Sequence, residues 1–441
     1  MVVILGAGIV GAATAYYLST DCSTTADFPP PITILDACPG PAGGSSGGAG
    51  AFLTNSPPIK TRGGGAKNSD KKRQALFEQS FNLHRKLATE LELQSWCEVQ
   101  KYQHLETCTT TTTTTTTNSC VNVNPPSWLA EGNIHATSLQ GDAALVDPYE
   151  LTSTLLNKAI AANPNAIFRQ ATVVGLETDD GNCCITGIRL QQDEHNNNSN
   201  NDSSSNEASL LMTIDPDEPV VIALGPWSCR IEDWLGQCMP IEGVLSTSMI
   251  FNMGIPQSDI GTALFCDEDD TNGCHLELLG RHDQSLYVSG CGESQVIGTQ
   301  ELRSQQRPSP AEKCSPNMAS AAAAQSSLRG MGYNCHSSQL HQQDEQPAPD
   351  VVQACIRPTS PDGLPVIGKL LDNCYVATGG GPWGMTWGPL MGQCLASIIN
   401  ENGDGDGDAP VRLGPLKPQR FDTLIYRTLL KSRASPDVKQ S

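Results

Sequence analysis

Short, mostly apolar runs recur along the chain. Val2–Leu5 is entirely apolar, Ile32–Asp36 is apolar except for Thr33 and Asp36, and Pro219–Gly225 is an apolar run that ends in glycine. Strands buried on both faces of a parallel sheet show this pattern, whereas half-exposed strands alternate polar and apolar residues. We therefore predict strands of a buried parallel sheet at these three places. A helix of small and apolar residues over 12–18 joins the first two strands into a βαβ unit.

Other segments predict a second, mixed or antiparallel sheet and further helices. A helix is expected over 71–93, because apolar residues there recur at spacings of three and four, and a shorter one over 317–328. Further strands are expected at 171–177, 245–251, 276–279, 285–290, 351–357 and 373–378.

Four stretches cannot bury apolar surface. Thr109–Thr117 is an unbroken threonine run, and His195–Asn206 is almost entirely asparagine and serine. Most of Ser304–Asp350, in particular 330–349, and the loop Glu401–Asp408 are also polar. Such compositions predict disordered surface insertions.

The first glycine loop, GAGIVG, follows the first strand and opens the first helix. In such a loop Gly6 permits the tight turn, Gly8 lets a phosphate approach the backbone and Gly11 lets the helix pack on the strand. Asp36 closes the second strand, where a carboxylate accepts hydrogen bonds from ribose hydroxyls and disfavours a 2′-phosphate. The alternative is a plain strand–helix turn. The flanking strand, helix and acid favour dinucleotide binding.

Two further glycine-dense segments extend this prediction. One is GGSSGGAGA over 43–51, and the other is YVATGGGPWGMTWGP over 375–389, close to the end of the chain. The latter predicts a strand, a turn at 379–381 and a helix over 383–399, whose N-terminal amides form an anion site. In a flavoprotein the reduced ring is such an anion. Glycine loops at both ends of the chain therefore predict one long dinucleotide, FAD. A plain turn packed by glycines is the alternative for the second segment.

Size and charge exclude several classes of protein. At 441 residues the chain is too long for one ordinary core, so we expect two domains. A formal charge of -20 argues against nucleic acid as a partner. No apolar run is long enough to span a bilayer. Seventeen cysteines show no paired metal spacing and no signal peptide precedes the first strand, so no metal site and a cytosolic protein are expected.

The chain resembles the FAD-dependent amine and amino-acid oxidase family that includes D-amino-acid oxidase, sarcosine oxidase and glycine oxidase. The motifs GAGIVGAATAYYL, GGSSGGAGAF, VVIALGPWS, RPTSPDGLPVIG and NCYVATGGGPWGMTWGPLMG carry the resemblance. A helix SFNLHRKLA over 80–88 is similar to that of a eukaryotic branch of oxidoreductases. The resemblance spans most of the chain outside the polar insertions.

This resemblance implies the residues that bind FAD. The pyrophosphate, ribose, adenine, ribityl and ring positions carry over to Gly6, Gly8, Ile9, Val10, Gly11, Asp36, Ser45, Ser46, Ala49, Gly50, Val174, Ala223, Leu224, Gly225, Trp227, Cys355, Gly380, Gly381, Trp383, Gly384, Met385 and Thr386. Most family members carry Glu where this chain has Asp36. Cys355 aligns with the cysteine that carries covalent flavin in sarcosine oxidases, and a buried, inert cysteine is the alternative.

The implied reaction is hydride transfer from a carbon bearing an amine to flavin N5, with dioxygen or another acceptor reoxidising the flavin. The resemblance implies Arg357 as the candidate catalytic residue, because similar enzymes place a substrate-facing residue at this position, and a guanidinium clamps a carboxylate bidentately. A structural ion pair or a surface arginine is the alternative. His84 lies on an apolar helix stripe and is interpreted as a core histidine instead of a base. Trp383 and Trp387 either wall the substrate cavity or pack in the core.

These observations predict an α/β protein in which a Rossmann-like FAD-binding domain is interleaved with a mixed or antiparallel substrate domain. Residues 1–60, 140–235 and 350–441 form the FAD-binding domain, and 61–139 and 236–349 form the substrate domain. We expect an oxidoreductase acting on a small amine or amino acid. Two alternatives remain: an FAD-binding regulatory protein associated with trafficking, peripherally on endosomes, and an NAD-dependent dehydrogenase. The sequence makes no prediction of oligomeric state.

Overall fold

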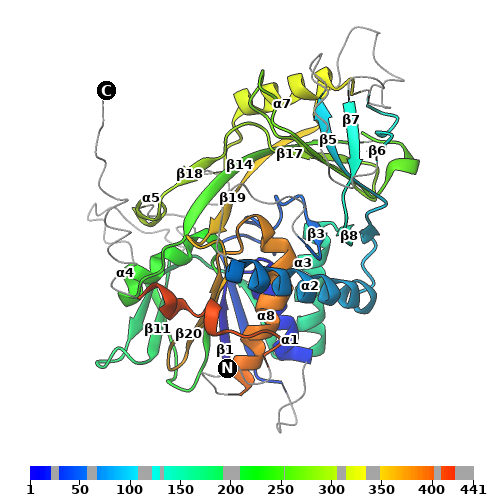
Figure 1. Cartoon of the computed structure of the whole chain (residues 1–441). Coiled ribbons are helices and arrows are strands. Elements are labelled where there is room, and N and C mark those ends of the chain that lie inside the picture. Colours follow the sequence, from blue (N-terminus) through cyan, green and yellow to red (C-terminus); the bar gives the residue numbers. More distant parts are fainter. Residues whose placement is uncertain are drawn as a thin grey trace, which may run out of the picture.

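The computed structural model describes residues 1–20, 29–56, 67–107, 122–129, 134–191, 209–252, 254–304, 314–333, 348–401 and 409–422. The predicted insertions 109–117 and 195–206, most of 330–349, and all but the first residue of 401–408 lie outside these ranges. Two large sheets dominate the described chain, one above the other in Figure 1.

The lower sheet is the predicted parallel one. The order of its six described strands is β20 (Val366–Leu371), β21 (Cys374–Thr378), β13 (Val220–Ile222), β1 (Val2–Leu5), β2 (Ile32–Asp36) and β9 (Ala166–Gln170). All neighbours pair in parallel except β20, which is antiparallel to β21. Strands from the start, middle and end of the chain therefore lie side by side.

Alternate residues of β1 pack into two hydrophobic cores on opposite faces of the sheet, which is why every residue of this strand is apolar. Val2 and Ile4 face a helical layer. Its helices are α1 (Ile9–Thr20), α2 (Lys67–Glu90), α3 (Pro148–Ala162) and α8 (Gly384–Asn400). Val3 and Leu5 face the antiparallel sheet β10 (Val173–Thr178), β11 (Ile185–Gln191) and β12 (Ser209–Thr213). The result is a three-layer arrangement.

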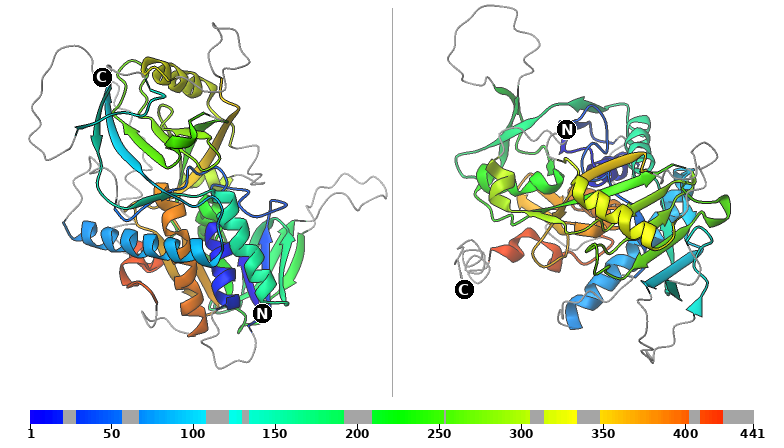
Figure 2. Two further views of the ribbon diagram at one scale, coloured as in Figure 1. Left: turned by 90° about the vertical axis from the view of Figure 1, so that its right-hand side faces the viewer. Right: turned by 90° about the horizontal axis from the view of Figure 1, so that it is seen from above.

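The upper sheet is mixed and nearly all antiparallel. Among the described residues it comprises β18 (Gln295–Ile297), β14 (Glu242–Phe251), β17 (Leu286–Ser289), β16 (Glu277–Gly280), β15 (Thr262–Cys266), β5 (Lys101–Thr107), β7 (Ile134–Ser138), β6 (Asn122–Val123) and β19 (Val351–Thr359), which pairs with β14. Only β15 and β5 pair in parallel among these strands. Helix α7 (Met318–Gly330) covers its outer face, as Figures 1 and 2 show.

Shorter elements complete the described chain. They are β3 (Phe52–Thr54), β8 (Ala143–Leu145), β4 (Cys97–Glu98), α4 (Ile231–Leu235), α5 (Thr299–Ser304) and the 3-10 turns η2 (Gly225–Arg230), η3 (Gln257–Asp259), η4 (Gly381–Trp383), η5 (Gly414–Leu416) and η6 (Pro418–Phe421). The three strands form a small separate sheet in the order β3, β8, β4. The α/β architecture with a parallel sheet and a second mixed sheet is confirmed. The predicted strands and helices are all present, with ends shifted by a few residues.

Helix α3 was missed by the sequence prediction although its start carries a clear signal. Asp147 is its N-cap and accepts a hydrogen bond from the Glu150 N–H at 2.7 Å, and Pro148 occupies the first turn. This Asp-Pro-x-Glu pattern is typical of a helix start. No helix of the described chain is both long and apolar enough to cross a membrane.

Candidate active site

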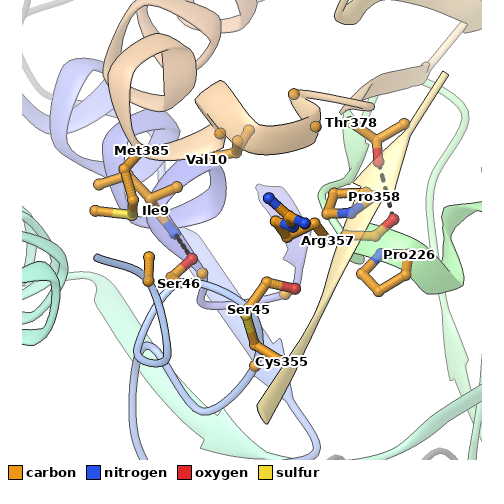
Figure 3. Close-up of a pocket in the computed structure, with 18 of the residues that line it drawn as sticks. Ile9, Val10, Ser45, Ser46, Pro226, Cys355, Arg357, Pro358, Thr378 and Met385 are labelled. Atoms are coloured by element: carbon orange, nitrogen blue, oxygen red, sulfur yellow. Dashed lines mark hydrogen bonds between the residues drawn. The ribbon is translucent and has the colours of Figure 1, made fainter. Parts of the chain in front are cut away.

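A cavity of about 290 Å³ lies between the two sheets, at the carboxyl ends of the parallel strands. The residues directly after β1, β13 and β21 line it, together with side chains from β14, β16, β17 and β19. Ligands bind at this end of open α/β sheets because helix N-termini and strand-end loops converge there. Figure 3 shows part of its wall.

The first glycine loop adopts the geometry that its sequence predicts. Gly6 has a φ of +106°, and a Cβ on it would lie 2.3 Å from the Ala223 carbonyl oxygen. A Cβ on Gly11 would lie 1.9 Å from the Gly6 carbonyl oxygen. Only glycine fits either position. The loop thereby delivers Gly8, Ile9 and the N-terminus of α1 to the cavity.

Asp36 lies at the end of β2 and lines the cavity. Its two carboxylate oxygens accept hydrogen bonds from the Ala7 and Cys38 N–H groups at 2.7 and 2.8 Å. Burial raises the pKa of Asp36, and these two hydrogen bonds oppose the rise. The backbone therefore holds the carboxylate in place, and each oxygen keeps a second lone pair for a hydroxyl.

The loop over 43–51 connects the dinucleotide loop to the upper sheet. The Ser46 hydroxyl accepts a hydrogen bond from the Ile9 N–H at 3.0 Å, and the Ser45 hydroxyl donates to the Ile356 carbonyl of β19. A Cβ on Gly50 would lie 2.8 Å from the Tyr287 ring. Figure 3 shows Ser46 beside Ile9 and Ser45 beside β19.

The N-terminus of α8 reaches the same cavity through the turn η4. Helices α1 and α8 pack backbone to backbone, since a Cβ on Gly388 would lie 2.7 Å from the Ile9 side chain and one on Gly392 2.6 Å from Ala13. Two helix N-termini from opposite ends of the chain thus face one space. Each presents backbone N–H groups and a partial positive charge.

His84 supports this second helix start from α2. Its Nε2–H donates to the Met385 and Thr386 carbonyls at 3.0 and 2.9 Å. Met385 needs this donor because the residue four positions later is Pro389, which has no N–H to continue the helix ladder. Burial lowers the His84 pKa to about 4, so the ring is neutral at pH 7. His84 is therefore a buried structural residue.

The cavity brings together most of the predicted residues. Those that line it are Gly6, Gly8, Ile9, Val10, Asp36, Ser45, Ser46, Ala49, Gly50, Ala223, Leu224, Gly225, Trp227, Cys355, Arg357, Gly380, Gly381, Trp383, Gly384 and Met385. Trp383 contributes to the wall, whereas Trp387 is buried in the core, 5.3 Å from the Phe77 ring.

Three predicted residues do not line the cavity. Gly11 packs inside the turn against Gly6. Thr386 is buried on α8, with its hydroxyl 3.4 Å from the Phe52 carbonyl. Val174 does not line the cavity, although its neighbour Val173, the first residue of β10, does.

Several lining residues carry no signal in the sequence. Arg230 and Trp234 line the cavity after β13, and burial lowers the pKa of the Arg230 guanidinium. The upper sheet adds Ser246, Ser248, Phe265, Glu277, Leu279, Tyr287 and Ser289. These come from four successive strands, β14 to β17, and each strand contributes only one or two of them, so no short motif unites them.

Arg357 and Cys355 project from β19 into the cavity, and Figure 3 shows the Arg357 side chain between the two glycine-rich segments. Arg357 Nη2 donates to the Ser246 hydroxyl at 2.6 Å and to Ser294 at 3.5 Å, while its Nε is buried without a hydrogen-bond partner among the described residues. Burial raises the pKa of the Cys355 thiol to about 11.

Comparison with known proteins identifies the family. The family model described as FAD dependent oxidoreductase, abbreviated DAO, matches residues 1–398. The chain belongs to this family. It is 25% identical over 407 residues to the Schizosaccharomyces pombe protein described as "Putative oxidoreductase C1F5.03c", covering 90% of this chain and 93% of that protein.

Solved structures of similar fold include glycine oxidase from Geobacillus kaustophilus, at a TM-score of 0.65 and 17% identity, over 95% of this chain and 98% of that one. L-amino acid deaminase from Proteus myxofaciens gives a TM-score of 0.63 and 16% identity, over 96% of this chain and 93% of that chain. These similarities show that the fold is shared.

As a member of the DAO family, the protein uses FAD as its cofactor. The cavity fits such a ligand, because three of its glycines leave the backbone accessible. A Cβ on Gly44, Gly225 or Gly384 would meet no protein atom within 4 Å, although all three line the cavity. Space beside exposed amide groups at two helix N-termini is what a pyrophosphate and an electron-rich ring require.

Proposed function

We propose that this DAO-family oxidoreductase oxidises a small amine or amino acid at the carbon that carries the nitrogen. When bound, FAD accepts the hydride, and dioxygen or another acceptor then takes the electrons. The protein's own part is to bind the substrate, orient it and exclude water.

The observation that carries this proposal is the state of Arg357. Its guanidinium lines the cavity, and its buried Nε lacks a hydrogen-bond partner among the described residues. A buried donor without a partner is costly unless a ligand satisfies it. A carboxylate fits because it accepts two parallel hydrogen bonds from one guanidinium. No ion pair holds Arg357 within the described chain, which argues against a purely structural role.

The residues around the cavity divide between the two ligands. We propose that the α1 N-terminus and the loop over 43–51 hold the pyrophosphate and ribityl chain, and that Asp36 accepts from the ribose. The amides over 380–385, at the start of α8, would stabilise negative charge on the reduced ring. Gly11, Thr386 and Val174 would support the site from just outside its wall.

Cys355 is proposed to contact the flavin as a neutral thiol. Burial raises its pKa to about 11, so the thiolate that a thioether linkage needs is scarce at pH 7. Phe265 and Leu279 line the same region and limit the access of water.

The predicted domain division stays part of the proposal. The FAD-binding domain would comprise 1–60, 140–235 and 350–441, and the substrate domain the segments between them. A cytosolic location is also proposed, since the described cysteines are free thiols, as in a reducing compartment.

The test is spectroscopic. Purified protein should be yellow. Its visible flavin band should bleach under anaerobic conditions when one compound from a panel of primary amines, N-methyl amino acids, D-amino acids and L-amino acids is added. A coloured protein that no member of the panel bleaches would contradict the proposed reaction. That outcome would favour a regulatory FAD-binding protein instead.

A further inference from the structure

Two side chains of opposite charge face the cavity without pairing. Arg357 on β19 and Glu277 on β16 both line it. Within the described chain, neither forms an ion pair with the other or with any third residue. Partly buried charges are costly unless they are paired. Two unpaired charges of opposite sign in one cavity suit a ligand that carries charge of both signs.

The strand geometry points Glu277 toward the cavity. Glu277 and Leu279 line it, whereas the intervening Leu278 packs on the other face of the sheet, in the core below α7. Oε2 of Glu277 accepts a hydrogen bond from the Ser289 hydroxyl at 2.8 Å. Oε1 accepts none among the described residues and is available to a ligand.

A smaller cavity of about 50 Å³ adjoins the main one and shares Ser246, Glu277, Ser289 and Arg357 with it. We call this space the side chamber. It adds Glu293 from the turn after β17. That turn is tight because Gly290 has a φ of +72° and a Cβ there would lie 2.1 Å from the His275 carbonyl oxygen. A space of this volume has room for only a few non-hydrogen atoms of a ligand.

The charges around the side chamber are unequal. Two carboxylates, Glu277 and the exposed Glu293, line it together with His275, and Arg357 stands at its junction with the main cavity. If Arg357 binds the carboxylate of a substrate, Glu277 and Glu293 face the remaining part of that substrate. A neutral side chain would leave Glu277 without a counter-charge, and an acidic one would be repelled.

We infer that the preferred substrate is an amino acid whose side chain ends in a cation, either an amine or a guanidine. Arg357 binds the substrate carboxylate, and Glu277, with Glu293 beyond it, binds the distal cation. This inference rests on the proposed oxidation of amino acids and specifies the class of substrate. Glu277 is then the residue that determines specificity.

The experiment compares matched substrates on the flavin-loaded, full-length protein. The D and L enantiomers of lysine and ornithine are compared with those of norleucine and norvaline, whose side chains have similar length and no distal charge. Glutamate is included as an amino acid with an acidic side chain. Anaerobic flavin reduction gives kcat/KM, and the thermal stabilisation of the loaded protein by each amino acid reports binding separately. We expect the basic amino acids to be preferred by roughly 10- to 100-fold, the range of a hydrogen bond to a charged group.

The Glu277→Gln variant removes the charge and keeps an acceptor for the Ser289 hydroxyl. It should abolish most of this preference, because kcat/KM for lysine and ornithine should fall toward the values for norleucine and norvaline. Glu301→Gln, on α5 outside the cavity, removes the same charge and is the matched control. The control should keep the preference of the unmodified protein.

Three outcomes would count against these ideas, and they are distinguishable. If neutral amino acids reduce the flavin as well as basic ones, the inference is wrong and the proposed function stands. If Glu277→Gln slows all amino acids equally, Glu277 holds the reacting amine and the inference is again wrong. If no amine or amino acid reduces the flavin, the proposed function itself fails.

Discussion

The two walls of the cavity are built in different ways. The wall toward the parallel sheet consists of loops and helix starts, where backbone N–H groups and glycines face the ligand. The wall toward the upper sheet consists of side chains from β14, β15, β16, β17 and β19. The first wall is proposed to hold the cofactor, and the second to bind the substrate.

This difference explains why the sequence identifies the family of the protein but does not identify its substrate. A wall of backbone tolerates few changes, because any Cβ at Gly6 or Gly11 would overlap a carbonyl oxygen. A wall of side chains can exchange Glu277 or Ser289 without altering the fold. The cofactor wall is therefore expected to be rigid and the substrate wall adjustable, and four changes test this contrast.

The largest effect is expected in the cofactor wall. In Gly11→Val the new Cβ would overlap the Gly6 carbonyl, so the helix must shift at a cost of about 3 kcal/mol or more. The variant should purify without bound flavin and with a clearly lower melting temperature. Gly40→Ala is the control, since a Cβ there meets nothing within 4 Å. Normal flavin content in Gly11→Val would refute the rigid-wall interpretation.

A change in the substrate wall should spare the cofactor. Arg357→Met removes one partner of a charged, desolvated pair, which costs about 2–5 kcal/mol. We expect kcat/KM for the best substrate to fall roughly 30- to 5,000-fold, with unchanged flavin content. Arg357→Lys keeps the charge and should lose less. A variant that loses its flavin instead would show that the two walls are not independent.

The third change acts through the helix start of α8. His84→Phe removes the donor that replaces the missing N–H of Pro389, which should cost about 1–3 kcal/mol of unfolding free energy. Urea denaturation measures this loss. Adding Pro389→Ala restores a helical N–H, so the double variant should recover part of it. If Pro389→Ala gives no recovery in the His84→Phe background, the proposed replacement is wrong.

His84 also predicts a dependence on pH. Its pKa is lowered to about 4 in the folded protein, so the unfolded chain binds the proton more readily. The stability that the neutral ring contributes is fully present above about pH 6.5 and falls toward pH 4, by roughly 3 kcal/mol in all. Because His84→Phe lacks this group, the stability gap between it and the unmodified protein should narrow as the pH falls across this window.

The smallest effect is expected at Cys355. Since its thiol is held neutral, acid precipitation should leave the protein pellet colourless and the flavin in the supernatant. Cys355→Ser should keep its yellow colour and nearly all its activity. A yellow pellet that becomes colourless in the Cys355→Ser variant would instead demonstrate a covalent linkage.

Sequence patterns predicted much of the lower sheet and its cofactor loops because their information is local. The glycines of the first loop, the acid at Asp36 and the strand–turn–helix over 375–399 lie within short segments. Helix α3 could also have been predicted from the cap at Asp147. The strands β9 and β20 were missed; both lie at the edges of the sheet, where a charged residue, Arg169 or Lys369, interrupts the apolar pattern.

The sequence by itself determined the βαβ unit, the cofactor loops, the family resemblance and Arg357 as a candidate, because turn geometry and buried strands require particular residues at particular spacings. Only the tertiary structure decided that Glu277, Tyr287 and Ser289 share a wall with Arg357, and that His84 completes the hydrogen bonding of α8. Those contacts join residues far apart in the chain, and strand pairing, which is set by the whole fold, brings them together.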